Sequence, residues 1–162
     1  MRRKAILAAV ITLVMLIPSF TYAETECVDS DIVTIDNEYY LETVIEDDDS
    51  TAKSIVQNLM SRGKATKTQS KTTYCKNSSG KVMWYVRVTG TFTYGNGSAK
   101  CTKSVCTAES KNKTWKVSGR SASKSGNKAS ASAKGTHYLN GAPVETISKT
   151  VTLKCSPTGD FS

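Results

Sequence analysis

Residues 81–94 read KVMWYVRVTGTFTY and carry the clearest two-residue period in the chain. Two sets of side chains alternate along this run: Val82, Trp84, Val86 and Val88 on one side, and Met83, Tyr85, Arg87 and Thr89 on the other. Successive side chains of an extended strand point to opposite faces, so the run predicts a long β-strand with one strongly apolar face. Gly90 interrupts the pattern and is predicted to mark a bulge or a bend.

Shorter alternating runs lie on both sides of this strand, and turn-forming residues separate them at 77–80, 95–97, 125–127 and 140–141. The Asn140-Gly141 pair is typical of a two-residue hairpin that joins residues 128–139 to residues 144–155. No sustained helical period occurs in residues 63–162. Six or seven short strands in a segment of this size predict an all-β fold, an immunoglobulin-like β-sandwich.

The first 23 residues have the pattern of a secretory signal peptide. Arg2, Arg3 and Lys4 precede an apolar run over residues 5–17, and the small residue Ala23 ends the stretch. A membrane-spanning helix needs about 18 or more apolar residues, so a cleaved signal is expected rather than a membrane anchor. We therefore expect a secreted, extracellular protein that begins at residue 24 and has no membrane span.

Charge divides the rest of the chain into two segments of opposite sign. Residues 24–61 contain eleven acids and one base, whereas residues 63–162 contain seventeen bases and three acids, although the whole chain has a net charge of +8. Segments of opposite sign attract one another in the intact protein and separate if the chain is cut. The sequence therefore predicts an acidic N-terminal segment over 24–62 and a basic β-sandwich domain over 63–162.

The acidic segment is predicted to form one strand followed by a short helix. Residues 36–45 are rich in aromatic and branched side chains, which favours a strand. Ser50 or Thr51 then caps a helix that closes at Gly63 and carries an apolar face. A helix of this length is marginal alone, so the segment either packs this face on the basic domain or stays disordered.

Five cysteines occur in the chain, and two of them share a strand parity with apolar residues. These sets are Ala99, Cys101 and Val105, and Val151, Leu153 and Cys155. Cys101 and Cys155 are therefore expected to face the core and to form a disulfide, which secretion permits. Cys27, Cys75 and Cys106 remain for a second bridge or a free thiol, and the odd count leaves room for a covalent dimer.

The sequence contains no convincing catalytic, cofactor or metal constellation. Residues 50–53 match the S-x-x-K pattern of serine acyltransferases, but the chain is too short for such a domain and its Ser- and Lys-rich composition repeats the pattern by chance. Residues 47–49 are three consecutive Asp residues without the spacing of an EF-hand loop. His137, the single histidine, shares a parity with small residues and is expected in the core or at its end. A hydrolase would need His137 beside a carboxylate and a hydroxyl in one pocket.

A basic extracellular domain suggests electrostatic binding of an anionic partner, such as a cell-wall polymer, an acidic glycan or an anionic lipid. The candidate contacts are Lys81, Arg87, Lys100, Lys113, Lys116, Arg120, Lys124, Lys128 and Lys134. Nucleic acid is a weaker interpretation because no recognition helix, aromatic RNA-binding strand or zinc finger is present. The plainest interpretation is that the lysines protect strand edges and keep the domain soluble.

A different class of function follows from the charge boundary. Cleavage near Arg62-Gly63-Lys64 would release the basic domain from an acidic pro-segment that masks it. The released domain would then act as a cationic, antimicrobial-like effector. The leading hypothesis remains a non-enzymatic binding module that uses the whole secreted chain.

Several stretches resemble a family of small secreted proteins of unknown function from Gram-positive, clostridia-type bacteria. They are residues 39–43, 65–68, 76–84, 86–94, 121–129 and 151–155. The resemblance implies a secreted β domain in which Cys101 and Cys155 are the recurrent pair, and it implies no activity. Cys27, Cys75 and Cys106 are additional to that pattern.

Overall fold

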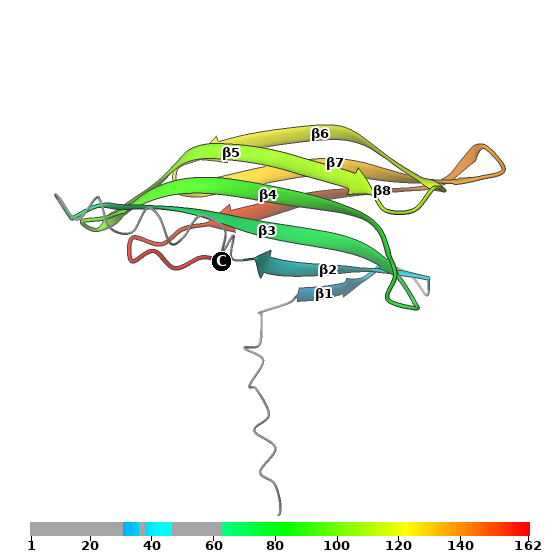
Figure 1. The fold of residues 1–162 in the computed structure, drawn as a ribbon, viewed down its shortest axis with the longest axis horizontal. Helices are drawn as coiled ribbons and strands as arrows, with labels where there is room; N and C mark the ends of the chain where they lie inside the picture. Colours follow the sequence, from blue (N-terminus) through cyan, green and yellow to red (C-terminus); the bar gives the residue numbers. More distant parts are fainter. Residues whose placement is uncertain (1–30, 36–37, 47–62) are drawn as a thin grey trace, which may run out of the picture.

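The computed structural model describes residues 31–35, 38–46 and 63–162, and this part of the chain is all-β. Five strands form the first antiparallel sheet: β1 (Asp31–Thr34), β2 (Tyr39–Glu46), β3 (Ala65–Asn77), β4 (Val82–Gly95) and β5 (Ser98–Ser110). Three strands form the second: β6 (Trp115–Ser125), β7 (Lys128–Leu139) and β8 (Ala142–Lys154). The two sheets make a β-sandwich (Figure 1), so the predicted fold class is confirmed.

The basic segment contributes six of these strands, as expected, and the predicted strand over 36–45 is found as β2. β1 is an additional strand that the sequence did not reveal. The signal peptide, the helix predicted to close at Gly63, and Cys27 lie outside the described residues. Within the described part of the chain, no helix is long and apolar enough to cross a membrane.

Each strand lies beside its neighbours in the sequence, so the connectivity within each sheet is a meander. Immunoglobulin domains instead use Greek-key connections between their sheets. The tight turns account for the difference. Asn96 and Gly97 both have positive φ, as do Asn140 and Gly141, and such mirror-image turns match the twist of adjacent antiparallel strands. Connections this short can only join neighbouring strands.

The core lies between large side chains on β4 and small ones on β7. Trp84, Val86, Val88 and Phe92 are buried on β4, and Ala129, Ala131 and Ala133 are buried opposite them on β7. The alternation predicted from residues 81–94 is therefore confirmed from Trp84 onward, whereas a bulge at Met83 leaves Met83 buried and Val82 half-buried at the start of the strand. Gly90 is not itself at a bulge: the nearest register shift lies between Thr91 and Phe92, and its extra residue is on β5. The missing side chain of Gly90 leaves room for the ring of Phe92.

A bulge in β5 reverses which side chains face the core after Cys101, so the predicted parity of that strand is wrong beyond this point. Thr91 pairs with Lys103 and Phe92 pairs with Cys101, so Thr102 is an extra residue. One inserted residue moves the following side chains to the opposite face of a strand. Cys101 is buried as predicted, but Val105 is 39% exposed because the bulge turns it outward.

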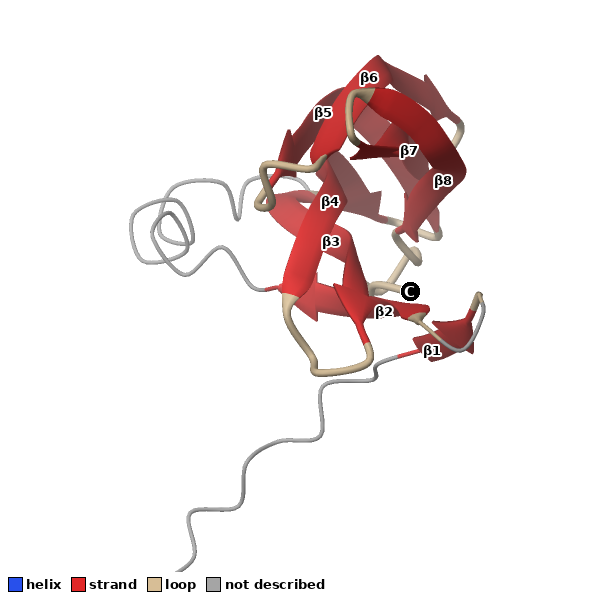
Figure 2. Cartoon of the chain, turned by 90° about the vertical axis from the view of Figure 1, so that its right-hand side faces the viewer, coloured by secondary structure: helices blue, strands red, loops and turns tan. Residues whose placement is uncertain are grey.

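The two sheets meet where β5 and β6 lie side by side (Figure 2). Polar side chains of β6 bond to the main chain of β5 there. Arg120 donates from Nε to the carbonyl of Ala108 on β5 at 2.7 Å. The Lys124 ammonium donates to the carbonyl of Thr102, also on β5. These hydrogen bonds satisfy main-chain groups on an otherwise unpaired sheet edge.

The acidic strand β2 is an interior strand of the first sheet, between β1 and β3. Its side chains Tyr39 and Leu41 are 5% and 7% exposed and belong to the core. Glu42 forms an ion pair with Lys76 of β3, and Glu46 forms one with Arg87 of β4. Acidic and basic segments therefore contact each other through both apolar packing and ion pairs.

Candidate functional site

The outer face of the second sheet carries lysines and hydroxyl groups. Along β7, the inward positions are Ala129, Ala131 and Ala133, so the residues between them point outward. Residues that pair directly share a face of the sheet, so the partners of these outward residues on β6 and β8 also point outward. The outward residues, named here the outer lysine face, are Lys116, Ser118, Ser121, Ser123, Ser125, Lys128, Ser130, Ser132, Lys134, Thr136, Thr146, Ser148, Thr150, Thr152 and Lys154.

No Asp or Glu side chain of the described residues lies on the outer lysine face. The single acid of strands β6–β8 is Glu145, which pairs with His137 on the opposite parity. Lys128 and Lys154 lie directly opposite each other on β7 and β8, and neither forms an ion pair with a described residue. Like charges at opposed positions destabilise a sheet, so an anion bound between these two ammonium groups would relieve the repulsion.

The remaining lysines extend the charge along the same face. Lys134 lies six residues from Lys128 on β7, a separation of about 20 Å in an extended strand. Lys116 lies opposite Thr136, and its ammonium is 4.7 Å from the ring centroid of Tyr138. Cationic groups at both ends of a hydroxyl-rich surface can hold the anionic groups of an extended polymer.

Hydroxyl groups on neighbouring strands bond to each other between these lysines. Ser130 and Thr152 share a hydrogen bond of 2.9 Å, and Thr136 and Thr146 share one of 3.1 Å. Each hydroxyl has one donor and two acceptor positions, so these pairs retain capacity for a ligand. The face can therefore contribute hydrogen bonds as well as charge.

The structure brings three of the nine predicted contact residues, Lys116, Lys128 and Lys134, to this face. Arg120 and Lys124 lie at the junction of β5 and β6, where their side chains donate to main-chain carbonyls. Lys81, Arg87 and Lys100 lie on the first sheet or in its turns, and Lys113 lies in the connection between β5 and β6 that joins the two sheets.

Arg87 is engaged within the protein. Its guanidinium forms the ion pair with Glu46 and donates from Nε to the hydroxyl of Thr72 at 2.9 Å. Tyr74 donates to the same Glu46 carboxylate at 2.6 Å. An arginine paired in this way neutralises an internal acid, so it adds little to the attraction of an external polyanion.

Lys154 is the lysine of the outer lysine face that is not among the nine predicted contact residues. A regular hairpin at Asn140-Gly141 pairs Leu139 with Ala142, and continuing that register would not place Lys154 opposite Lys128. A register shift after His137 produces the observed pairing. The alternation of residues 150–154 could have indicated that Lys154 faces outward, but not which residue it faces.

His137 lies at one end of the core in an aromatic cluster. Its ring stacks on Trp115 at 5.1 Å with an interplanar angle of 3°, and it meets the edge of Tyr39 at 6.1 Å. The Tyr39 hydroxyl donates to Glu38 at 3.0 Å. Burial and this hydrogen bond raise the pKa of Tyr39 to about 12, so its hydroxyl is a poor nucleophile at neutral pH.

The predicted disulfide between Cys101 and Cys155 is not formed in the structure. Neither sulfur is in a disulfide, and the described residues contain no disulfide bond. The Cys101 thiol donates instead to the carbonyl of Lys103 at 3.2 Å, and the Cys155 thiol donates to that of Ser156 at 3.4 Å. Burial raises the pKa of both thiols, which lowers the fraction of each that is thiolate at neutral pH.

The main chains of Cys101 and Cys155 are nevertheless held to the same turn. The Cys101 N–H donates to the carbonyl of Gly126 at 2.8 Å, and the Cys155 N–H donates to that of Asn127 at 3.1 Å. Gly126 and Asn127 are adjacent residues between β6 and β7. Hydrogen bonds to this turn therefore hold the main chains of the two cysteines close to each other.

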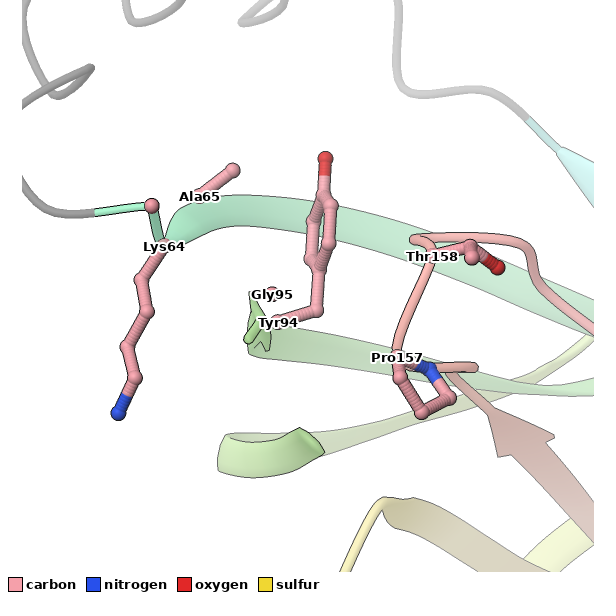
Figure 3. Close-up of a pocket in the computed structure, with 7 residues that line it drawn as sticks. Lys64, Ala65, Tyr94, Gly95, Pro157 and Thr158 are labelled. Atoms are coloured by element: carbon pink, nitrogen blue, oxygen red, sulfur yellow. The ribbon is translucent and has the colours of Figure 1, made fainter. Parts of the chain in front are cut away.

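A small hollow of about 260 Å³ lies beside Tyr94, where the C-terminal turn meets the ends of β3 and β4 (Figure 3). The ring of Tyr94 stands between Lys64 on one side and Pro157 and Thr158 on the other. This lining contains no histidine, cysteine or carboxylate side chain. Among the described residues, no group of three or more His, Cys, Asp or Glu side chains could hold a metal ion.

Comparison of the chain with protein-family models, with curated proteins and with solved structures finds no match.

Proposed function

We propose that this protein is a secreted, non-enzymatic binding module for anionic surface polymers or glycans, and that the outer lysine face is its binding surface. The observation that carries the proposal is the opposed pair Lys128 and Lys154, on a face that contains no Asp or Glu side chain of the described residues. Secretion rests on the signal-peptide pattern of residues 1–23. The partners that fit are cell-wall polymers, acidic glycans and anionic lipid.

Simple electrostatics explains how such a face would work. Exposed ammonium groups attract a polyanion over a distance set by the ionic strength, about 8 Å at physiological salt. A shallow, twisted sheet offers many equivalent positions to a linear polymer, and the hydroxyl rows add hydrogen bonds along its length. Binding of this kind is broad in specificity and is reversed by salt.

The test is elution from an immobilised dextran sulfate column by a salt gradient. The variant Lys128→Gln/Lys154→Gln removes the opposed pair, and Lys81→Gln/Lys100→Gln removes the same charge from exposed positions on the first sheet. We expect the first variant to elute at clearly lower salt and the second to elute close to the wild type. Equal shifts would show that net charge alone governs retention, and salt-insensitive retention would contradict the electrostatic mechanism.

In the alternative, cleavage near Arg62-Gly63-Lys64 releases a cationic effector. For this release, β1 and β2 have to dissociate from the first sheet. That dissociation would expose the core contacts of Tyr39 and Leu41 and break the ion pairs of Glu42 and Glu46. The position of β2 therefore favours a module that acts as the whole secreted chain.

A further inference from the structure

The two sheets separate on the side away from the β5–β6 junction, where β1–β3 face the edge strand β8 (Figure 2). A groove of about 360 Å³ lies between these strands. This volume is near the lower end of the range for small-molecule sites, so the groove suits one compact ligand. It is named here the inner groove, and it shares only Thr150 and Thr152 of β8 with the outer lysine face.

The inner face of the first sheet becomes polar as it approaches the groove. One row of directly paired residues crosses all five strands in the order Asp31, Thr43, Thr73, Val86 and Ala108. Val86 and Ala108 belong to the buried core, whereas the first three residues of the row line the groove. Polar side chains thus occupy positions where a sandwich would normally have apolar ones.

Two lysines enter the groove from opposite sheets. Lys71 of β3 pairs with Val88, which is fully buried, and Lys149 of β8 pairs with the buried Ala133, so both lysines occupy core-facing rows. Both are half-buried, and neither forms an ion pair with any described residue. Asp31 is the one carboxylate of the groove lining, and neither lysine is ion-paired with it, so a bound anion would satisfy these partly desolvated ammonium groups.

The rest of the lining provides hydrogen-bonding and apolar surfaces together. The hydroxyls of Thr43 and Thr73 share one hydrogen bond of 2.8 Å and retain further acceptor positions. Asp31 lines the β1 side and can accept a hydrogen bond from a ligand hydroxyl. Val33 and Val151 add apolar contact, and β8 is the edge strand of the second sheet.

We propose that the inner groove binds an acidic sugar of the hexuronic acid class. The sugar carboxylate lies between the ammonium groups of Lys71 and Lys149, its hydroxyls bond to Thr43, Thr73 and Asp31, and its C–H face packs on the valines. A simple inorganic anion would use only the lysines, and a neutral sugar would leave both lysines unpaired. The proposal does not depend on the outer lysine face.

The test is titration of the purified protein with glucuronate at physiological salt, followed by amide NMR shifts. Glucose and inorganic sulfate are titrated in parallel as neutral-sugar and simple-anion probes. We expect saturable shifts in β3 and β8 with glucuronate and much weaker effects of both other probes. Equal binding of sulfate would overturn the sugar assignment, equal binding of glucose would overturn the role of the lysines, and absence of glucuronate binding would overturn the site.

Variants separate this site from the outer lysine face. Lys71→Gln/Lys149→Gln should bind glucuronate at least tenfold more weakly, because each substitution removes a charged hydrogen bond. Lys128→Gln/Lys154→Gln carries the same net charge and should bind glucuronate like the wild type. Loss of glucuronate binding only in Lys128→Gln/Lys154→Gln would show that glucuronate binds at the outer lysine face and not in the inner groove.

A folding control completes the design. Lys149→Arg keeps the positive charge and should retain glucuronate binding within a few-fold, and thermal unfolding checks that the glutamine variants remain folded. If Lys71→Gln/Lys149→Gln unfolds, the milder variant Thr43→Val, which removes one hydroxyl at constant size, should still weaken binding. Unchanged binding in a folded Thr43→Val protein would then overturn the site.

Discussion

Gly135 of β7 lies directly against the indole ring of Trp84 on β4, so that a side-chain carbon at position 135 would overlap the indole nitrogen and its neighbours. Trp84 is 1% exposed and is among the largest buried side chains of the described core. The two residues come from different sheets. Their contact shows how the small residues of β7 allow the sheets to approach each other at the widest side chain of β4.

Gly135→Ala should therefore destabilise the protein by about 1–3 kcal/mol, because an added methyl in a closely packed core forces the neighbouring ring or strand to move. Chemical denaturation measures the change. Ser148→Ala, on the exposed outer side of β8, is the control and should change the stability by less than about 0.5 kcal/mol. Equal stability of the two variants would mean that the packing at Trp84 is looser than described.

Leu41→Ala should destabilise the protein by about 2–5 kcal/mol, because Leu41 belongs to the core although it lies in the acidic segment. Ile32→Ala, at a position on β1 that is 63% exposed, should have little effect. Urea unfolding of both variants measures the difference. A negligible effect of Leu41→Ala would indicate that β2 does not belong to the stable core, which would favour the model of a removable pro-segment.

The stability of the protein should fall between pH 10 and pH 12 in a way that depends on Tyr39. Burial first, and then the hydrogen bond to Glu38, raises the pKa of Tyr39 from 10.0 to about 12. Below the unfolded-state pKa the neutral phenol contributes its full stabilisation. Between the two values the unfolded state loses the proton first, so stability declines as the pH rises.

Tyr39→Phe tests this dependence, because it removes the titrating group and keeps the ring. We expect the loss of unfolding free energy between pH 9.5 and pH 11.5, on the order of 1–2 kcal/mol for such a shift, to be smaller in the variant than in the wild type. The two proteins differ only in this hydroxyl, so the comparison isolates its contribution. Parallel pH profiles would contradict a raised pKa for Tyr39.

The intact mass of protein collected from an oxidising medium should increase by two hydrogens on reduction. Cys101 and Cys155 are bonded through their main chains to adjacent turn residues, Gly126 and Asn127, so we expect their thiols to be the pair that oxidises. Cys101→Ser should abolish the increase, whereas Cys106→Ser should preserve it. Loss of the increase in Cys106→Ser would assign the bridge to a different pair.

Much of the local structure could be predicted from residue pattern and turn chemistry. The alternation in residues 81–94 identified β4 and its buried face, and the Asn140-Gly141 pair identified the hairpin between β7 and β8. The alternation of Ala with Ser and Lys in β7 separated its inner and outer sides. These features depend on neighbours two to four residues apart, so they can be read along the chain.

The candidate site was only partly predictable, because its members come from different strands. Lys128 and Lys134 could be assigned to one face of one strand, but their relation to Lys154 depends on the register shift after His137. Arg87 belonged to the predicted contact set, yet its ion pair with Glu46 depends on the packing of the acidic strand. Charge in the sequence does not show which bases are already paired in the fold.

Residue pattern along the chain is enough to assign this protein to the all-β class, to place its hairpin turns and to separate its acidic segment from its basic one. Which side chains share a surface follows only from how the strands pair. Side chains in a strand alternate with a period of two, so a single extra residue such as Thr102 reverses every later side chain, and its position is set by the partner strand. The pairing of β2 with β3 and the facing of Lys71 toward β8 depend in the same way on contacts between distant strands.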